Sequence, residues 1–344
     1  MAQVKRDLRY ERCMVLAGGG FRFGYYLGMH AAAVDAGRAP DLLLATCGGA
    51  IAGAIIAGLP DTASRKAWLM SPQMHAFFSD LRSGPRASPL RVAAQVVLRR
   101  LRRKPAMRIP DLFRDYLFEM PAVLPLPTPI VSPAAPALAV LGGRLLFGAA
   151  DAGQARGDRP LYQITLFAND RIAALADGLP AAMRDWTNTV APTLHVDTAV
   201  PIADAARISI TDMFYFKAQQ ANNAHYTGGA IDLMPVELAH HLAHHVTMEI
   251  KQPYDQLMAI PALRAVVGID GNQRMRHVHA QPAGAWIDTS DAPSALRGTG
   301  IRKRIDWRCN TIRLIAPSSY DQYAADIDTQ WRYGYERAQK AYQA

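Results

Sequence analysis

The chain has 344 residues, of which 50% are hydrophobic, so it can bury the core of one large domain, and disordered and collagen-like classes are excluded. Its 38 Lys and Arg residues exceed its 29 Asp and Glu residues by nine. The segment from Arg82 to Arg108 contains nine basic residues and no acidic one, so the remaining 29 basic and 29 acidic residues cancel. We therefore expect a neutral globular body with one basic patch, which argues against a protein coated in positive charge for nucleic acid.

The N-terminal residues, the cysteines and one uncharged run indicate the compartment of the protein and the kinds of site it can hold. The residues before Cys13 are charged and lack the apolar stretch of a secretory signal, so we expect a cytoplasmic protein. Cys13, Cys47 and Cys309 are too few and too scattered for a disulfide framework or a zinc site. Residues 42–59 are uncharged, but their four glycines and flanking Pro-Asp pairs favour a strand, a turn and a helix over a membrane span.

The first sixty residues alternate between strand and helix patterns. An apolar run at 13–17 is of strand type and ends in the glycines 18–20, and residues 25–36 then have the composition of a helix. A second apolar run at 42–44 leads through a sharp turn to a helix rich in Ala and Ile. This alternation predicts a parallel sheet with covering helices, an α/β architecture.

Residues 64–137 interrupt the alternation, and we interpret them as an insertion or lid within a single domain that spans residues 1–344. The insertion contains the basic segment 82–108. It ends in a segment, 121–136, whose six prolines cannot form a central strand or helix. We expect this last segment to be an extended, semi-rigid connector.

The α/β pattern returns in the second half of the chain. Strands are predicted at 161–168, 208–210 and 311–315, and residues 327–342 have Trp331, Tyr335 and Ala338 at helical spacing.

The glycines 18–20 follow a strand, where their backbone N–H groups can face an anion because no Cβ blocks its approach. Their spacing does not fit the dinucleotide-binding fingerprint, and no Gly-Lys-Ser/Thr sequence marks a phosphate-binding Walker loop. By itself the triplet is more typical of a tight turn.

Cys47 occupies the sharp turn between the second strand and its helix. A side chain there projects at the edge of the sheet and lies at the N-terminus of a helix, whose dipole favours an anion. We therefore expect a lowered thiol pKa and a nucleophile at Cys47. Cys13, inside a strand, and Cys309 are expected to be structural.

Three segments together carry a resemblance: GGGFRFGYYLG, then ATCGGAIAGAIIAG, and later YTGGAIDLMPVELA. In order and spacing they resemble the patatin-like phospholipase family of acyl hydrolases, over roughly residues 12–60 and 160–340. The resemblance implies a three-layer α/β fold with a central, mostly parallel sheet, to which the basic and Pro-rich insertion adds a cap. It also implies a glycine-rich oxyanion loop, a nucleophile elbow and a Ser-Asp dyad.

This chain departs from the family pattern at the residues that carry the chemistry. Cys47 stands where the family has its serine, and Thr227 stands where the dyad has its aspartate. Ala45 replaces the first glycine of the elbow, and Phe23 the last glycine of the oxyanion loop. A thiol is partly ionised without a base, so the loss of the aspartate costs a cysteine enzyme less than a serine enzyme.

If a base is required, Asp232 and His225 are the main candidates near Thr227, and Asp212 is a third. We predict that oxyanion or anion binding involves the N–H groups of Gly18, Gly19, Gly20 and Gly48, with Arg22 either taking part or fixing the loop as a structural cation.

The sequence contains two further clusters of chemically notable side chains. His240, His241, His244 and His245 form two i,i+4 pairs on an expected helix, but a histidine-rich face is favoured over a site, so we predict neither a metal nor a cofactor. In the basic segment an apolar stretch precedes a cationic cluster that would lie on an anionic membrane surface; an ordinary solvated helix is the alternative. The cations are Arg99, Arg100, Arg102 and Arg103.

The sequence thus predicts an acyl-ester or thioester hydrolase that acts on lipid or other hydrophobic acyl substrates through a cysteine acyl-enzyme. The alternatives are an acyltransferase that uses the same cysteine, and an inactive homologue that binds lipid or a partner. We expect a cytoplasmic location, peripheral at the inner face of the membrane if the basic segment binds lipid, and no nucleic-acid partner; no oligomeric state is predicted.

Overall fold

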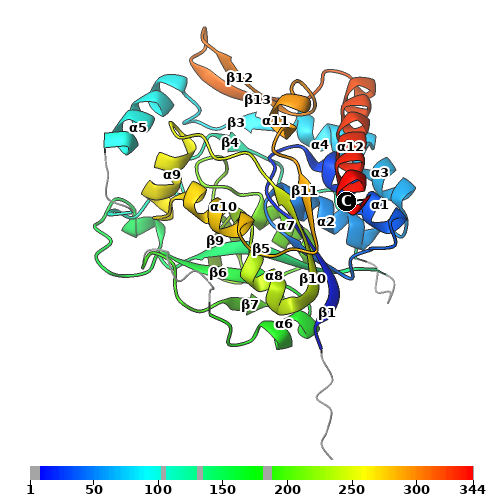
Figure 1. The fold of residues 1–344 in the computed structure, drawn as a ribbon. Helices are drawn as coiled ribbons and strands as arrows, with labels where there is room; N and C mark the ends of the chain where they lie inside the picture. The colour runs from blue at the N-terminus through cyan, green and yellow to red at the C-terminus, as the bar shows by residue number, and fades with distance from the viewer. Residues whose placement is uncertain (1–7, 102–105, 130–134, 181–187, 344) are drawn as a thin grey trace, which may run out of the picture.

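The central feature of the fold is one mixed sheet of nine strands, most of them parallel (Figure 1). The computed structural model describes residues 8–101, 106–129, 135–180 and 188–343. Seven strands lie in the order β11, β10, β1, β2, β5, β6, β7, and β9 extends the edge of β5 and pairs with β8. Their bounds are β1 Tyr10–Leu16, β2 Leu42–Ala45, β5 Ala137–Leu145, β6 Tyr162–Phe167, β7 His195–Asp197, β8 Gln219–Ala221, β9 Ala224–Thr227, β10 Ala243–Ile250 and β11 Ala285–Asp288.

The strands from β11 to β5 are parallel, so their carboxyl ends meet at one edge of the sheet. β1 and β2 are in register from Cys13 opposite Leu42 to Leu16 opposite Ala45. The chain therefore leaves both strands at the same level, through the glycines 18–20 after β1 and through Cys47 after β2. This edge is where α/β sheets hold their ligands.

Alternate strand residues face two separate apolar cores, which makes three layers. Met14, Leu16 and Leu43 face a core that they share with α1, α2, α7 and α12. Cys13, Val15 and Leu44 face the other core, covered by α6, α8, α9 and α10. The three-layer α/β architecture predicted from the sequence is confirmed. The helices are α1 Phe23–Asp35, α2 Gly48–Gly58, α6 Asp170–Ala176, α7 Ile202–Ser209, α8 Val236–Leu242, α9 Ala259–Val266, α10 Gly271–His279 and α12 Tyr320–Gln343.

The long helix α12 packs tightly on α1, and the two helices run side by side in Figure 1. Two glycines make this approach possible. A Cβ on Gly28 would lie 2.0 Å from the carbonyl oxygen of Trp331, and a Cβ on Gly334 would lie 1.9 Å from that of Tyr25. The Oε1 atom of Gln330 also accepts a hydrogen bond from Gly24 N at 3.1 Å, so the C-terminal helix supports the start of α1.

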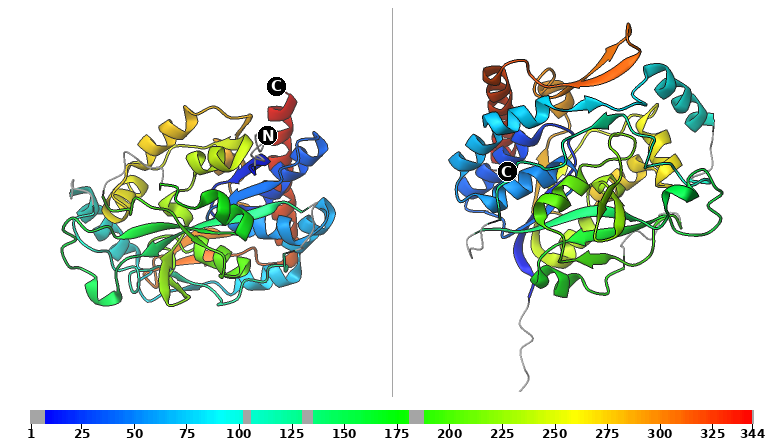
Figure 2. Two further views of the ribbon diagram at one scale, coloured as in Figure 1. Left: turned by 90° about the horizontal axis from the view of Figure 1, so that it is seen from below. Right: turned by 180° about the vertical axis from the view of Figure 1, so that it is seen from behind.

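The segment 64–137, predicted as an insertion, contains short elements and one longer helix. They are α3 Thr62–Leu69, α4 Pro72–Ser79, β3 Arg82–Ser83, α5 Pro89–Leu101 and β4 Phe118–Glu119. The described prolines of the stretch 121–136 lie outside helices and strands, in the approach to β5. Figures 1 and 2 show α5 projecting on the same side of the molecule as a hairpin of β12 (Arg302–Asp306) and β13 (Thr311–Ile315), next to which lies α11 (Ala292–Ala295).

Several predicted elements differ in the structure. Residues 208–209, predicted as a strand, form the end of α7, because alternation over three residues does not distinguish a strand from a buried helical turn. The strand at 311–315 exists but pairs only with β12, outside the central sheet. The expected helix through His245 ends at Leu242, and His244 and His245 lie in the central strand β10. In the described ranges no helix is both long enough and apolar enough to cross a membrane.

Candidate active site

Cys47 lies at a strained turn between β2 and α2. Its backbone has a φ of 49° and a ψ of −126°, a left-handed region that few residues other than glycine adopt. Close packing forces the glycines that follow: a Cβ on Gly49 would lie 2.0 Å from the carbonyl oxygen of Leu16, and one on Gly48 would lie 2.4 Å from that of Gly20. The alanine at 45 fits because its methyl group faces Gly53 of α2. The chain therefore keeps the elbow geometry despite the substituted first glycine.

The thiol of Cys47 hydrogen-bonds to a carboxylate. Its Sγ lies 3.0 Å from Oδ2 of Asp212, a residue in the loop that follows α7. The backbone N–H of Cys47 donates to Oγ of Ser209 at 2.8 Å, and that hydroxyl donates to the carbonyl oxygen of Leu141 at 2.6 Å. The last residue of α7 therefore holds the backbone of the elbow cysteine, and the loop that follows α7 holds its side chain.

Asp212 is fixed in place by the third glycine motif. Its Oδ1 accepts a hydrogen bond from the N–H of Ala230 at 3.3 Å. The N–H of Gly228 donates to the carbonyl oxygen of Thr211 at 2.6 Å, and a Cβ on Gly228 would lie 2.6 Å from Oδ1 of Asp212. The motif Thr227-Gly228-Gly229 thus packs directly on the segment that carries the carboxylate, although the motif itself lacks one.

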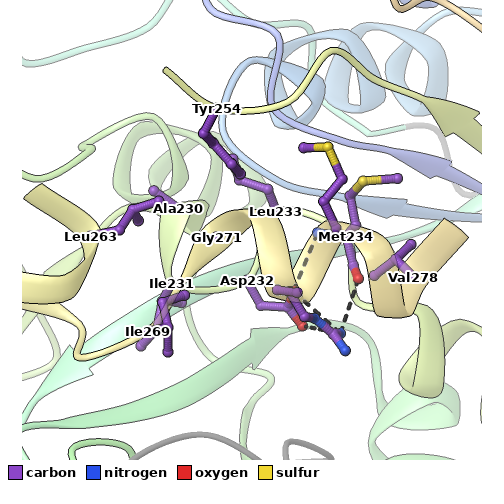
Figure 3. Close-up of a pocket in the computed structure, with 12 residues that line it drawn as sticks. Ala230, Ile231, Asp232, Leu233, Met234, Tyr254, Leu263, Ile269, Gly271 and Val278 are labelled. Carbon is purple, nitrogen blue, oxygen red and sulfur yellow. Dashed lines mark hydrogen bonds and ion pairs between the residues drawn. The ribbon is translucent and has the colours of Figure 1, made fainter. Parts of the chain in front are cut away.

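Thr227 and the two bases favoured from the sequence make other contacts. The Thr227 hydroxyl donates to the carbonyl oxygen of Thr211 at 3.3 Å. His225 lies in β9, with its ring at 5.1 Å from that of Phe113. Asp232 is buried, and its Oδ2 lies 3.2 Å from Nη2 of Arg274. Figure 3 labels Asp232 and marks its contacts with dashed lines. In the structure, therefore, Asp212 contacts the thiol, whereas Asp232 forms an ion pair with Arg274.

The environment of the thiol changes its acidity. Burial, and next the negative charge of Asp212, raise the pKa of Cys47 well above its usual range, although the N–H of Gly48 and the ammonium group of Lys251 act in the opposite direction. The prediction of a lowered pKa from the helix N-terminus is therefore wrong, because desolvation exceeds the dipole effect. Burial also raises the pKa of Asp212 to about 6.

The glycine loop lies against the nucleophile. A Cβ on Gly18 would lie 3.1 Å from Cβ and 3.6 Å from Sγ of Cys47. Gly20 has a φ of 66°. In the part of the chain that the structure describes, the N–H groups of Gly19 and Gly20 donate to no protein acceptor. Together with the N–H of Gly48, they provide backbone donors close to the thiol.

A buried polar cluster behind the loop was not predicted from the sequence. Nζ of Lys251 donates to the Tyr25 hydroxyl at 2.9 Å and to Oε1 of Glu249 at 3.1 Å, and the Glu249 side chain is fully buried. A Cβ on Gly19 would lie 2.4 Å from the Tyr25 hydroxyl oxygen. These groups support the glycine loop from behind. From the sequence, Tyr25 was predicted only as part of a helix. Lys251 and Glu249 lie at the end of a strand that was not predicted.

Two cavities meet at the glycine loop, and Gly20 and Arg22 line both. The larger has a volume of about 460 Å³ and extends from Gly20 and Gly48. Its apolar wall comprises Phe21, Phe23, Ile210, Phe216, Leu296, Ile301 and Leu314. The smaller, of about 190 Å³, contains Lys251 and Tyr25 in its lining. Arg22 therefore borders both cavities beside the glycine loop.

The cations predicted for membrane contact differ in exposure. Arg99 packs inward: its guanidinium lies 3.7 Å from the ring centroid of Phe214 and 3.9 Å from Oδ2 of Asp115. Arg100 is exposed, whereas Arg102 and Arg103 lie outside the described residues. His240 and His241 remain in α8, and no group of His, Cys, Asp and Glu side chains suited to a metal occurs among the described residues.

Solved structures that resemble the chain include VipD from Legionella pneumophila, at 12% identity and a TM-score of 0.38, and human GIVD cytosolic phospholipase A2, at 10% identity and a TM-score of 0.38. The likeness covers 97% of this chain and 67% of the VipD chain, and 99% of this chain but only 60% of the human chain. No curated protein matches the sequence.

A sequence model described as "Patatin-like phospholipase" matches residues 14–240. The matched range covers more than half of the chain. It includes the glycine loop, the elbow and the third glycine motif, which lie together in the structure. The chain therefore belongs to the patatin-like phospholipase family.

Proposed function

We propose that the protein is a lipid acyl hydrolase that works through a Cys47 acyl-enzyme, with Asp212 as the general base. The observation that carries this proposal is the 3.0 Å hydrogen bond between the Cys47 thiol and the Asp212 carboxylate, at a strained elbow beside a glycine loop. Membership of a family of lipid acyl hydrolases supports the same reaction class.

In the first step Asp212 accepts the thiol proton while Sγ attacks the acyl carbonyl carbon. Because burial keeps the thiol neutral, proton transfer accompanies the attack, and no preformed thiolate is needed. The tetrahedral intermediate then expels the alcohol, which takes the proton from Asp212, and a thioester remains on Cys47. A water molecule, deprotonated by Asp212, cleaves the thioester and releases the free acid, and the thiol regains its proton.

The developing negative charge on the carbonyl oxygen needs donors. The N–H of Gly48 lies next to the thiol, and the N–H groups of Gly19 and Gly20 belong to the glycine loop that packs against Cys47. Such donors act without reorganisation when they are fixed before the reaction. The hydroxyl of Tyr25, held by Lys251, lies against Gly19 and supports this arrangement. We assign Arg22 to the binding of an anionic substrate group, because it lines both cavities at the loop.

The larger cavity supports a hydrophobic acyl substrate with an anionic part. Its apolar wall fits an acyl chain, while Arg22, Arg297, Arg302 and Lys303 contribute cations to its lining. A thioester intermediate is also activated for transfer to an alcohol, amine or thiol, so the acceptor decides between hydrolase and acyltransferase. The contact between thiol and carboxylate favours either enzyme over an inactive lipid-binding homologue.

Acyl-enzyme trapping tests the nucleophile. Incubation with p-nitrophenyl butyrate is expected to release p-nitrophenolate and to add one butyryl group to the intact protein, at Cys47 by peptide mapping. Cys47→Ala should carry no adduct, whereas the control Cys309→Ala, which removes an exposed thiol, should behave like the wild type. An adduct that persists in Cys47→Ala, or a folded wild type that neither reacts nor turns over, contradicts the proposal. Added alcohols distinguish transfer from hydrolysis by their ester products.

The pH dependence tests the base. Asp212 must be ionised to accept a proton, so kcat/KM for an activated ester should rise with pH and level off above a midpoint of about 6. The folded-state pKa of Asp212 lies above its ordinary value of 3.8, so between these two values the folded protein binds more protons than the unfolded chain. The free energy of unfolding should accordingly fall as the pH rises through this window. A flat rate profile from pH 5 to 8 would exclude Asp212 as the base.

A further inference from the structure

Figure 1 shows α5 and the β12–β13 hairpin on one side of the molecule, and both elements carry exposed apolar side chains. Trp307, in the turn of the hairpin, is 70% exposed, and Ile305 next to it is also exposed. On α5 the exposed apolar residues are Leu90, Val97, Leu98 and Leu101. Soluble surfaces rarely expose a tryptophan and several aliphatic side chains together, and such patches mark contact sites.

The hairpin is held firmly, so its exposed tip is a built feature. β12 and β13 pair over five residues each. Asp306 accepts hydrogen bonds from the N–H groups of Arg308 and Cys309 at 3.1 and 3.2 Å, which fixes the turn around Trp307. Near its turn the hairpin is joined to the insertion: the N–H of Ile312, which pairs with Ile305, donates to the carbonyl oxygen of Ala87 at 2.6 Å, two residues before α5 begins.

Charge identifies the partner. The hairpin, residues 301–315, contains five cations and only one acid, Asp306, whose carboxylate lies 3.6 Å from Arg313. The exposed cations of α5 add to this charge. A tryptophan flanked by cations suits the interface of an anionic bilayer, where the indole lies at the level of the headgroups and the cations bind their phosphates. The hairpin cations are Arg302, Lys303, Arg304, Arg308 and Arg313, and those of α5 are Arg91 and Arg100.

The surface is continuous with the candidate active site. Arg302 and Lys303, in the first strand of the hairpin, line the 460 Å³ cavity that reaches Gly20 and Gly48. The Nζ atom of Lys303 also donates to the hydroxyl of Tyr215, in the same lining. A bilayer bound by the hairpin would therefore bring its headgroups to the mouth of this cavity.

We propose that the β12–β13 hairpin, with Trp307 at its tip, and the exposed face of α5 form one docking surface for an anionic phospholipid bilayer. This proposal rests on the proposed function only in one respect, namely that docking brings the lipid hydrolase to its substrate. Binding to the bilayer itself requires no catalysis. The hairpin is the main membrane contact in this proposal. Arg99, which the sequence predicted as a membrane contact, packs inward.

Vesicle co-sedimentation tests the proposal with the full chain. The wild type is expected to bind phosphatidylcholine vesicles that contain phosphatidylglycerol, and to bind pure phosphatidylcholine weakly. Trp307→Ser and the pair Arg304→Gln/Arg308→Gln should each weaken binding to the anionic vesicles by about tenfold. Leu8→Ser, which changes an exposed apolar residue before β1, is the matched control and should leave binding unchanged.

Turnover of p-nitrophenyl butyrate, measured in parallel, separates the two proposals. Trp307→Ser should keep the wild-type rate on this water-soluble ester while it loses vesicle binding. If no variant turns over the ester but binding still depends on Trp307, the docking surface stands and the hydrolase proposal fails. Docking is refuted if both hairpin variants bind like the wild type, or if Trp307→Ser abolishes self-association by ultracentrifugation and has no effect on vesicles.

Discussion

Asp212→Asn is expected to lower kcat/KM for an activated acyl ester by about 10²- to 10⁴-fold, the usual contribution of a general base. The amide keeps the shape of the side chain and can still accept from the Cys47 thiol, so the elbow remains intact. It cannot take the proton, and the residual rate should lose its dependence on pH near 6. Burial disfavours the ionised carboxylate, so the amide should also raise the melting temperature at pH 8.

Asp232→Asn is the matched control, because it removes the aspartate that the sequence favoured as the base. Asp232 pairs with Arg274, which also binds Glu237 through Nη1 at 2.6 Å, so the substitution removes one charged partner of Arg274 while Glu237 remains. We expect turnover per folded molecule to stay near the wild-type value, with some loss of stability. Steady-state kinetics and thermal melts of both variants check this. If Asp232→Asn abolishes turnover and Asp212→Asn does not, the assigned base is wrong.

Gly334→Ala is expected to destabilise the fold by about 3 kcal/mol, at the upper end of the usual cost of overpacking. The new methyl group would lie 1.9 Å from the carbonyl oxygen of Tyr25, so α12 and α1 must move apart. Because the Tyr25 hydroxyl lies against Gly19, this movement also displaces the glycine loop. Both the melting temperature and the rate at low temperature should therefore fall.

Gly37→Ala is the control for that substitution. Gly37 also has little tolerance for a side chain, since its φ is 65°, but a Cβ there would meet no atom within 4 Å. It should cost only the left-handed backbone strain of about 1–2 kcal/mol and leave the rate unchanged. Equal rates for both variants after correction for the folded fraction would show that α12 does not support the glycine loop.

The elements of the first sixty residues could be predicted from the sequence. β1, α1, β2 and α2 occur within a few residues of their predicted places, because uninterrupted apolar runs and glycine stops identify buried strands and helices well. β6 was predicted from its apolar run, and α12 from the helical spacing of Trp331, Tyr335 and Ala338, although α12 begins at Tyr320 and not at residue 327. The limits of the insertion remain a prediction, although β5 begins at Ala137, where the insertion was expected to end.

The parts that could not be predicted depend on tertiary contacts. β10 contains His244 and His245, which made the segment look like the face of a polar helix, yet it forms a central strand between β1 and β11. The helix dipole suggested an acidic thiol at Cys47, but burial and Asp212 determine its pKa. The excess charge of the basic segment predicted one cationic patch. The five cations of the hairpin were not predicted as a second patch, because acids elsewhere in the chain balance them in the net charge.

The side-by-side packing of Thr211 and Gly228 has a consequence for how such sequences are classified. The two backbones are joined by a 2.6 Å hydrogen bond, so a carboxylate carried one residue after Thr211 reaches the elbow from the neighbouring segment. A search for the dyad aspartate at one fixed position would score this chain as a pseudoenzyme. A family member with a displaced carboxylate should be judged active or inactive from the position of that carboxylate in space, and not from its column in a sequence alignment.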